Sequence, residues 1–442
     1  MQHGKIQSSQ AVTTFGIGSI CDLSVKGGVN SGIIAGLDDW PTKPENEIYE
    51  PSLAKALGVN KLYAPPEGED LKSVDCLPAY RFPRRLFCNK CQRIGFPGAH
   101  FVANKGAIPK CKKNNCGGIG VPPRLVVVCF DYDNDGLVRG CIDDFPWEWW
   151  LFEREKRCDS PELFMVQSKK TFTLAGLKIE CRCGSCNDKS RSLEGVFGER
   201  ALIGRRCRGK RPWLNDEIDC GRHVRALLRG ASNVYFPVNF STISIPPYSD
   251  ALVRAVYQCK MVIEMPGVAL EQKIESIRRN VPEVEQYNDP EIADAIDIIT
   301  GNKVKTPAPV NSQEQRNKER NALYNGHLGD GKSSSNSDFI AKPATDFEME
   351  SSPLLSSYVS KLVHVSRLRE VKALRGFLRL ENPWGNDPLS QACEKISKAE
   401  KDWLPAIETR GEGFYLEFQR ERLTGWLRQD LVQERFSLIK NN

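Results

Sequence analysis

The feature that most constrains this chain is its sixteen cysteines, several of which come as closely spaced pairs. The first residues contain no apolar secretory segment, and no apolar run reaches the roughly 18 residues that a membrane span needs. We therefore expect a cytoplasmic protein, in which thiols stay reduced and disulfides are rare. Paired cysteines in such a protein indicate metal ligands. Since Zn²⁺ binds well to four thiolates, the sequence predicts two zinc sites and a weaker third one.

The clearest predicted site joins two cysteine pairs. Cys88 and Cys91 are separated by two residues, and Cys111 and Cys116 by four, with nineteen residues between the pairs. Two such knuckles can place four thiolates tetrahedrally around one Zn²⁺ ion. The small residues Gly117-Gly118 follow the last cysteine, where a tight turn needs them. Four buried thiols without a metal are the alternative interpretation.

The second predicted site is less regular. Cys183 and Cys186 form another closely spaced pair, and Cys207 and Cys220 are single cysteines in a basic, glycine-containing loop. We expect these four to bind a second Zn²⁺, although the neighbouring Cys181 could take the place of Cys183.

A weaker third site would use three single cysteines and would lack a fourth ligand; buried thiols beside strands are the alternative. The cysteines of this possible third site are Cys129, Cys141 and Cys158. All predicted sites are structural, because catalytic zinc usually keeps an open position and often binds histidines. The chain has only five histidines, with no His-x3-His spacing. The remaining cysteines are expected in the core: Cys21, Cys76, Cys259 and Cys393.

The net charge of +6 allows a nucleic-acid partner without requiring one. A basic cluster in the cysteine-rich region could follow phosphates, and Trp213 and Tyr235 could offer stacking faces for bases. The alternative is a solvated charged surface with two aromatic residues in the core. The predicted nucleic-acid contacts are Arg205, Arg206, Arg208, Lys210 and Arg211.

Two motif matches lack the context that their chemistry requires. The run Gly326–Ser333 fits the phosphate-loop pattern GxxxxGK[ST], but polar residues flank it where a buried strand and a helix are needed. The run Asp131–Gly136 begins like a calcium loop, but Ile142 stands where a bidentate carboxylate is required. A hairpin between Leu125–Phe130 and Leu137–Ile142 is the better interpretation.

Patterning predicts an irregular multi-domain α+β protein with zinc-ribbon modules bound by four cysteines. The predicted regions are an N-terminal region (1–80), a cysteine-rich zinc-binding domain (81–247), a helical segment (248–302), a disordered linker (303–352) and a C-terminal α/β segment (353–442). The linker is expected because its few apolar side chains cannot offset the entropy of ordering it.

Local signals predict individual elements. Apolar residues recur every three or four positions after Gly267, and Pro282 should end this helix at about Asn280. A second helix should begin at Asp289 and Pro290, with Asp289 as N-cap. Runs rich in β-branched and aromatic residues predict strands at Leu125–Cys129, Val234–Phe240, Phe377–Leu380 and Phe414–Phe418.

A series of short motifs runs in order along nearly the whole chain. The most specific part comprises Cys207–Trp213, Cys220 and Arg229–Pro237. The other motifs are Gln7–Gln10, Thr14–Gly18, Gly36–Trp40, Arg81–Pro83, Asp144–Trp147, Ser244–Pro246, Leu368–Val371, Gly376-Phe377 and Gly411–Phe414. Together these motifs resemble those of the DrmB family of the DISARM anti-phage defence system.

Two departures from this family stand out. The family tends to carry Gly-His before the Asp-Phe-Pro-Trp element, where this chain has Gly140-Cys141. The family also continues into a further C-terminal domain with its own His and Cys cluster, whereas this sequence stops at Asn442. We therefore expect a shortened or split member.

The resemblance implies a non-catalytic accessory subunit that acts beside a superfamily-2 helicase (DrmA-like), which carries the ATPase activity. The complex would engage DNA and restrict phage. The alternative is a stand-alone zinc-dependent nucleic-acid-binding protein or nuclease. A nuclease would need carboxylates on a metal ion, and the only dense acidic set is Asp131, Asp133, Asp143 and Asp144.

Overall fold

The computed structural model describes residues 6–25, 28–67, 76–102, 107–130, 140–153, 158–167, 174–186, 189–302, 311–328, 337–380 and 386–440. Contacts between residues divide the chain into two units. Unit 1 comprises Met1–Glu47, Tyr63–Phe240 and Ala373–Ile407, and unit 2 comprises Ile48–Leu62, Ser241–Lys372 and Glu408–Asn442. Helices and many small sheets together confirm the predicted irregular α+β class. Each unit combines several of the predicted regions, whose boundaries stay a prediction.

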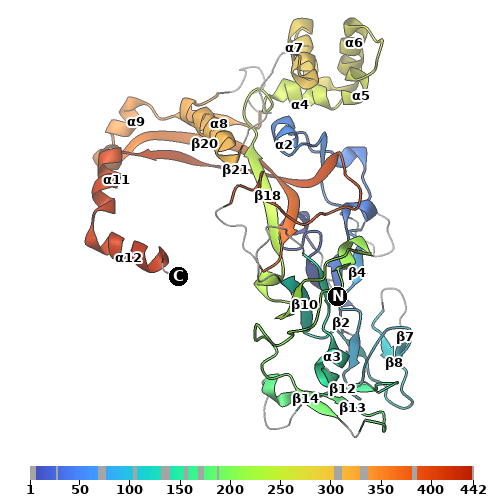
Figure 1. Ribbon diagram of the computed structural model, residues 1–442. Coiled ribbons are helices and arrows are strands. Elements are labelled where there is room, and N and C mark those ends of the chain that lie inside the picture. Colours follow the sequence, from blue (N-terminus) through green and yellow to red (C-terminus); the bar gives the residue numbers. More distant parts are fainter. Residues whose placement is uncertain are drawn as a thin grey trace. The chain divides into compact units, whose positions relative to one another are not determined.

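Unit 1 contains small antiparallel sheets of two or three strands (Figure 1). Their orders are β1-β2-β4, β11-β10-β17, β12-β13-β14, β6-β5-β9, β7-β8 and β15-β16. The strands are β1 (Ile20–Val25), β2 (Gly28–Ile34), β4 (Ala79–Arg81), β5 (Leu86–Cys88), β6 (Ile94–Gly95), β7 (Phe101–Val102), β8 (Lys110–Cys111), β9 (Gly120–Val121), β10 (Leu125–Phe130), β11 (Ile142–Asp144), β12 (Leu163–Gln167), β13 (Leu177–Cys181), β14 (Ser190–Ser192), β15 (Lys210–Arg211), β16 (Asp216–Glu217) and β17 (His223–Leu228). Short turns join them, and the helical pieces are α1 (Ser8–Val12), η1 (Leu37–Asp39), η2 (Pro44–Asn46), α3 (Trp147–Phe152), η3 (Leu174–Gly176), η4 (Pro212–Leu214) and η5 (Ser232–Val234).

Strand β10 is the centre of its sheet and confirms the predicted strand there. Its residues from Leu125 to Cys129 are all buried, as expected for a continuous apolar run between two neighbouring strands. Of the predicted hairpin partner Leu137–Ile142, Ile142 pairs with Val128, and the paired strand β11 continues beyond it to Asp144. Residues 131–139, including Asp131 and Asp133, lie outside the described residues.

The main core of unit 1 forms around α3. The rings of Phe145 and Trp147 lie 4.6 Å apart and those of Phe145 and Trp150 lie 5.9 Å apart. These side chains pack with apolar residues of β10, β12, β13 and β17. Burying such large rings supplies much of the apolar area that stabilises this unit.

A five-stranded sheet follows the order β18-β20-β21-β3, with β19 paired to β20. Its strands are β3 (Lys61–Tyr63), β18 (Phe236–Ile243), β19 (Ile340–Pro343), β20 (Val359–Leu378) and β21 (Trp403–Phe418). The predicted strand at Val234–Phe240 therefore begins later, after η5, and the two short C-terminal strands belong to the much longer β20 and β21. The helices of unit 2 outside the next module are α2 (Pro51–Ala56), α8 (Ser312–Asn325), α9 (Asp346–Glu350), α10 (Pro353–Tyr358), α11 (Arg420–Leu427) and α12 (Asp430–Lys440).

Residues 251–300 of unit 2 form a helical module with its own apolar core. Its helices are α4 (Ala251–Tyr257), α5 (Lys260–Ile263), α6 (Leu270–Asn280), η6 (Pro282–Val284) and α7 (Asp289–Thr300). The predicted end of α6 is confirmed. The predicted N-cap of α7 is wrong by one residue, because Asn288 accepts a hydrogen bond from the amide of Glu291 (3.0 Å) and donates its own amide to the Glu291 carboxylate (2.8 Å).

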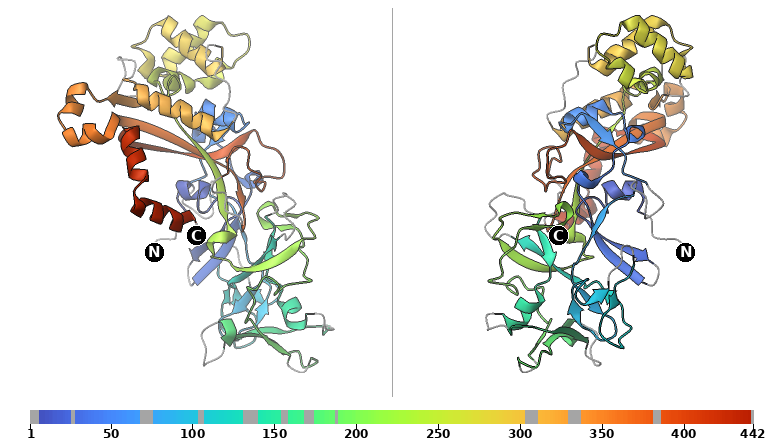
Figure 2. Two further views of the ribbon diagram at one scale, coloured as in Figure 1. Left: turned by 60° about the vertical axis from the view of Figure 1, so that its left-hand side comes forward. Right: turned by 90° about the vertical axis from the view of Figure 1, so that its right-hand side faces the viewer.

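Helix α8 lies inside the segment for which a disordered linker was predicted (Figure 2). Polar groups anchor it: Glu319 is 2% exposed, accepts the amide of Ile243 (3.0 Å) and pairs with Arg316 (2.7 Å). Ala322 and Leu323 also pack on a small apolar core. The low apolar content of the segment therefore did not indicate this helix. The rest of the phosphate-loop match, after Leu328, lies outside the described residues.

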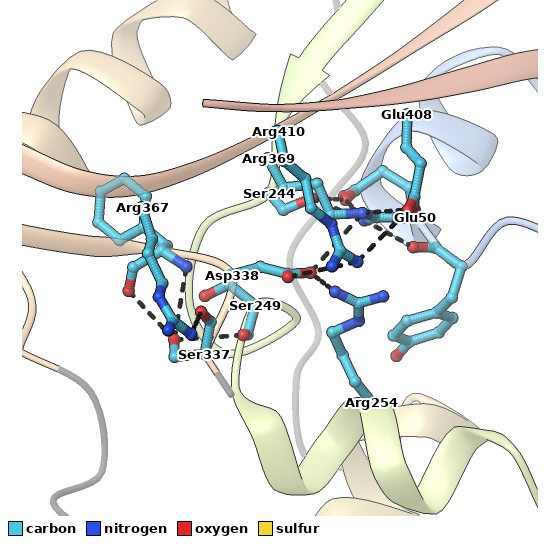
Figure 3. A network of polar contacts seen from close by, with 12 residues as sticks. Glu50, Ser244, Ser249, Arg254, Ser337, Asp338, Arg367, Arg369, Glu408 and Arg410 are labelled. Carbon is cyan, nitrogen blue, oxygen red and sulfur yellow. Dashed lines mark hydrogen bonds and ion pairs between the residues drawn. The ribbon is translucent and has the colours of Figure 1, made fainter. Parts of the chain in front are cut away.

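A buried ionic network ties several segments of unit 2 together (Figure 3). The Arg369 side chain, 2% exposed, contacts the carboxylates of Glu50 (3.3 Å), Asp338 (3.6 Å) and Glu408 (2.8 Å). It also donates to the Ser244 hydroxyl (2.8 Å). Burial raises the pKa of Glu50, although Ser244 and Arg369 oppose this. The other cations of the network are Arg254 and Arg410.

Candidate metal centres and a charged cleft

Twelve cysteines of unit 1 gather in three clusters of four, and within each cluster the sulfurs lie within 4.8 Å of one another. Four sulfurs held about 2.3 Å from one tetrahedral Zn²⁺ ion would lie about 3.8 Å apart. The sulfur separations in the first and third clusters, given below, fall close to this value. The donor set and its spacing therefore fit one thiolate-bound metal ion in each cluster.

The first cluster is the predicted set of Cys88, Cys91, Cys111 and Cys116. Its sulfurs are 3.5 Å apart between Cys88 and Cys116 and 3.8 Å apart between Cys91 and Cys111. Strands β5 and β8 each end on one of these cysteines. A Cβ atom at Gly118 would lie 2.4 Å from the Cys88 sulfur, so the turn has no room for a larger residue there.

The second cluster joins Cys129, Cys141, Cys207 and Cys220. Cys129 lies on β10, and its amide donates to the carbonyl of Cys141 (3.1 Å). The amide of Gly209 points at the Cys207 sulfur (3.3 Å). Gly209 has φ +68°, and a Cβ atom there would lie 1.6 Å from a backbone oxygen, so only glycine suits this knuckle.

The third cluster joins Cys158, Cys181, Cys183 and Cys186. The Cys183 sulfur lies 3.6 Å from that of Cys158 and 3.3 Å from that of Cys186, and the Cys158 and Cys181 sulfurs are 3.8 Å apart. The amide of Ser185 (3.4 Å) and the neighbouring thiols lower the pKa of Cys183 to about 6. A lower thiol pKa favours the thiolate, the form that binds metal.

The structure corrects how the sequence grouped these residues. The eight predicted ligands all lie in four-cysteine clusters, but Cys183 and Cys186 are not together with Cys207 and Cys220. The three cysteines of the weaker third prediction also separate, with Cys129 and Cys141 in one cluster and Cys158 in another.

The reason for the different grouping is strand pairing. Strand β17 pairs with β10, placing Val224 opposite Cys129 and bringing the preceding Cys220 to that cluster. Strand β13 pairs with β12, placing Cys181 opposite Leu163, five residues after Cys158. Spacing along the chain identifies a knuckle, whereas the partner of each knuckle depends on the sheet. Metal binding itself stays a prediction at all three clusters.

The predicted nucleic-acid contacts lie beside the second cluster, but three of them are paired with acids. Arg208 contacts Asp143 (2.7 Å), and Arg211 contacts Asp216 through two nitrogens (2.6 and 2.9 Å). Lys210 pairs with Glu217. The Arg206 guanidinium lies 3.2 Å from a ring nitrogen of His223.

The two proposed stacking residues do not serve that role. Trp213 is 0% exposed, and its ring nitrogen donates to the carbonyl of Lys395 (3.0 Å). The ring of Tyr235 packs on Phe377 (5.3 Å), and burial raises the pKa of its hydroxyl. Trp213 is therefore a core residue, and Tyr235 is half-buried with its hydroxyl inside the protein.

A cleft of about 780 Å³ in unit 1 brings three of the predicted contacts together: Arg205, Arg208 and Lys210. The other basic side chains of the lining are Arg81, at the end of β4, and Arg84 and Arg85, which follow this strand. The run Arg81-Phe-Pro-Arg-Arg85 is a basic signal in the sequence, but these arginines were not among the predicted nucleic-acid contacts. Phe96, 39% exposed, and Trp149 add rings to the lining.

The acidic pair in this cleft is engaged by protein groups. Burial raises the pKa of Asp144 to about 6, against a hydrogen bond from the amide of Arg85 (3.0 Å). Asp143 is held by Arg208. Within the described residues, the groups with metal-ligand spacing contain only cysteines, so the acidic pair gives no support to a metal-dependent nuclease.

Comparison with known proteins agrees with the resemblance in the sequence. The family described as "Domain of unknown function (DUF8724)" matches residues 7–236, a span that contains all three cysteine clusters. The "DISARM protein DrmB" of Bacillus paralicheniformis (strain ATCC 9945a / NCIMB 11709 / CD-2) is 28% identical over 426 residues, covering 91% of this chain and 69% of the relative. Across the part of the chain that the structure describes, no helix is both long and apolar enough to span a bilayer.

Proposed function

Because the chain belongs to the family described as "Domain of unknown function (DUF8724)" and is DrmB-like, we propose that it is a zinc-containing, non-catalytic subunit of a cytoplasmic anti-phage defence complex. Its likeness to DrmB points to a component of the DISARM system. The ATPase activity of the complex belongs to a partner, a superfamily-2 helicase of the DrmA type.

The observation that carries the non-catalytic role is the donor set of the three clusters. Each offers four thiols to one ion, which fills a tetrahedral site and leaves no position for water or substrate. Zinc sites of this kind stabilise folds. Here they would hold together small sheets of two or three strands, of which a two-stranded one is marginally stable at best by itself.

The basic cleft supports a secondary role in DNA engagement. Six basic side chains line it, yet five carboxylates line it too, and several of these are already paired. Since non-specific DNA affinity grows with the number of phosphates that cations neutralise, this cleft alone would bind DNA weakly. We therefore assign it to contacts made within the helicase complex, where the partner supplies most of the affinity.

DNA binding by the assembled complex tests this assignment. The variant Arg84→Ser/Arg205→Ser removes one cation from each of the two basic segments that line the cleft. Arg200→Ser, at an exposed site outside the lining, is the matched control. We expect the double variant to weaken DNA binding several-fold and to lower the salt dependence by about one unit for each lost phosphate contact. The control should behave as the unaltered complex.

Equal binding by all three proteins would remove the cleft from the DNA path. Metal-dependent DNA cleavage by the purified chain, lost in Asp143→Ala, would replace the accessory role with a nuclease.

A further inference from the structure

Strand β21 has one edge that is only partly covered by the described residues. It is bonded to β20 on one side and to β3 on the other. Strand β3 has three residues, and the contact between the rings of Tyr63 and Trp403 (5.4 Å) puts it beside the start of β21. Within the described part of unit 2, the segment Glu408–Phe418 therefore has no strand along that edge. Open edges of this length are ready sites for strand pairing.

The backbone groups on this edge can be assigned by alternation. The carbonyl of Glu417 accepts from the Ser360 hydroxyl (3.0 Å), and the amide of Gln419 donates to the carbonyl of Tyr358 (2.8 Å). Both partners lie on the side of β20. Because successive residues of a strand point their backbone groups to opposite edges, those of Phe414, Leu416 and Phe418 point outward.

The same three residues also carry apolar side chains on an uncovered face. Phe414 is 69% exposed, Leu416 44% and Phe418 56%. Tyr415, between them, packs on the opposite face with the core under α8. Large apolar side chains at every second position of an exposed edge strand indicate an interaction surface.

The order of these side chains fits a second copy of the same strand. In an antiparallel pair with a two-fold axis at Leu416, Leu416 meets itself and Phe414 lies opposite Phe418 of the other copy. On the other face, Tyr415 lies opposite Glu417. No like charges meet, and the aromatic pairs form on one face, where such pairs stabilise a sheet. The outward backbone groups are those that a hydrogen-bonded pair at Leu416 requires.

We propose that β21 pairs with β21 of a second copy, joining two sheets across a two-fold axis at Leu416. The strand contact alone is smaller than the roughly 800 Å² per partner of a stable interface. Dimerisation is therefore concentration-dependent. This proposal is independent of the metal sites and of the helicase role.

Paired charges test both the dimer and its register. In Phe414→Glu/Phe418→Lys, the glutamate of each copy lies opposite the lysine of the other copy, so the dimer persists. Phe414→Lys/Phe418→Lys changes the same exposed positions but places like charges opposite, so the dimer is lost. Sedimentation equilibrium gives the oligomeric state, and thermal unfolding verifies that both variants fold. Met261→Lys, at a 78% exposed site on α5, is the control and stays dimeric.

Residue-resolved hydrogen exchange adds a readout that needs no substitution. The amides of Phe414, Leu416 and Phe418 should exchange more slowly as the concentration of the unaltered chain rises. A chain that stays monomeric up to its solubility limit overturns the proposal. Equal dimerisation of the two charge variants overturns the register, and slower exchange only upon addition of the helicase assigns the edge to that partner instead.

Discussion

Substituting cysteines in pairs distinguishes the structural grouping from the one expected from sequence spacing. In the structure, Cys158 and Cys183 share a cluster, whereas Cys183 and Cys207 belong to different clusters. The variant Cys158→Ser/Cys183→Ser should therefore lose one metal ion of three. Cys183→Ser/Cys207→Ser, with the same number of substitutions, should lose two. If Cys183 and Cys207 shared a site, the second variant would lose no more metal than Cys183→Ser alone.

The magnitude follows from the donor sets. Four thiolates on one Zn²⁺ ion give an apparent binding free energy of about 10–16 kcal/mol in small zinc domains. This is comparable to the whole net stability of a domain, about 5–15 kcal/mol. Loss of one cluster should therefore lower the melting temperature of unit 1 strongly, and loss of two should leave much of it unfolded.

Native mass spectrometry of soluble protein measures the metal count for each variant. The control is Cys259→Ser, which alters a buried thiol in the helical module outside every cluster and should keep three ions. Counts of three, two and one for the unaltered chain, the first variant and the second variant support the grouping. Equal counts for the two double variants refute it, and a metal-free but normally melting chain refutes the metal sites altogether.

Three further predictions concern single residues. Arg369→Met should lower the free energy of unfolding, measured in urea, by about 3–5 kcal/mol, because it leaves buried carboxylates without their central cation. The control Arg410→Met, at a 57% exposed side chain, should lower it by about 1 kcal/mol or less. Burial raises the pKa of Asp144 to about 6 in the folded protein, above its value of about 3.9 in the unfolded chain. The contribution of Asp144 to the free energy of unfolding therefore falls as pH rises between these values. Asp144→Asn should remove that part of the pH dependence. An unchanged difference between the two proteins from pH 4 to 7 would contradict the shift. Gly118→Ala should release one metal ion, since its methyl group would collide with the Cys88 sulfur; full metal content would contradict that packing.

Closely spaced cysteine pairs could be predicted from the sequence, whereas the grouping of distant cysteines into one cluster could not. Cys88, Cys91, Cys111 and Cys116 were grouped correctly because both of their pairs carry a recognisable spacing. Cys207 and Cys220 have no such spacing, and their partners Cys129 and Cys141 come together only when β10 pairs with its neighbours. Pairing between strands that are far apart in sequence leaves no local signal.

The fold shows the same division between local and distant information. The end of α6 before Pro282 was predictable from one residue's backbone restriction. Helix α8 was missed because few of its side chains are apolar: Ala322 and Leu323 pack on a core, and Glu319 adds an ion pair and a bond to a distant backbone amide. The ionic network around Arg369 was equally hidden, since its carboxylates come from Glu50, Asp338 and Glu408.

The role as an accessory subunit is tested by co-purification of the tagged chain with the neighbouring helicase, with zinc counted in the same sample. We expect a stable complex that contains three zinc ions for each copy of this chain and in which the ATPase activity depends only on the helicase. A folded chain with three zinc ions that never retains the helicase would contradict the proposed role as an accessory subunit.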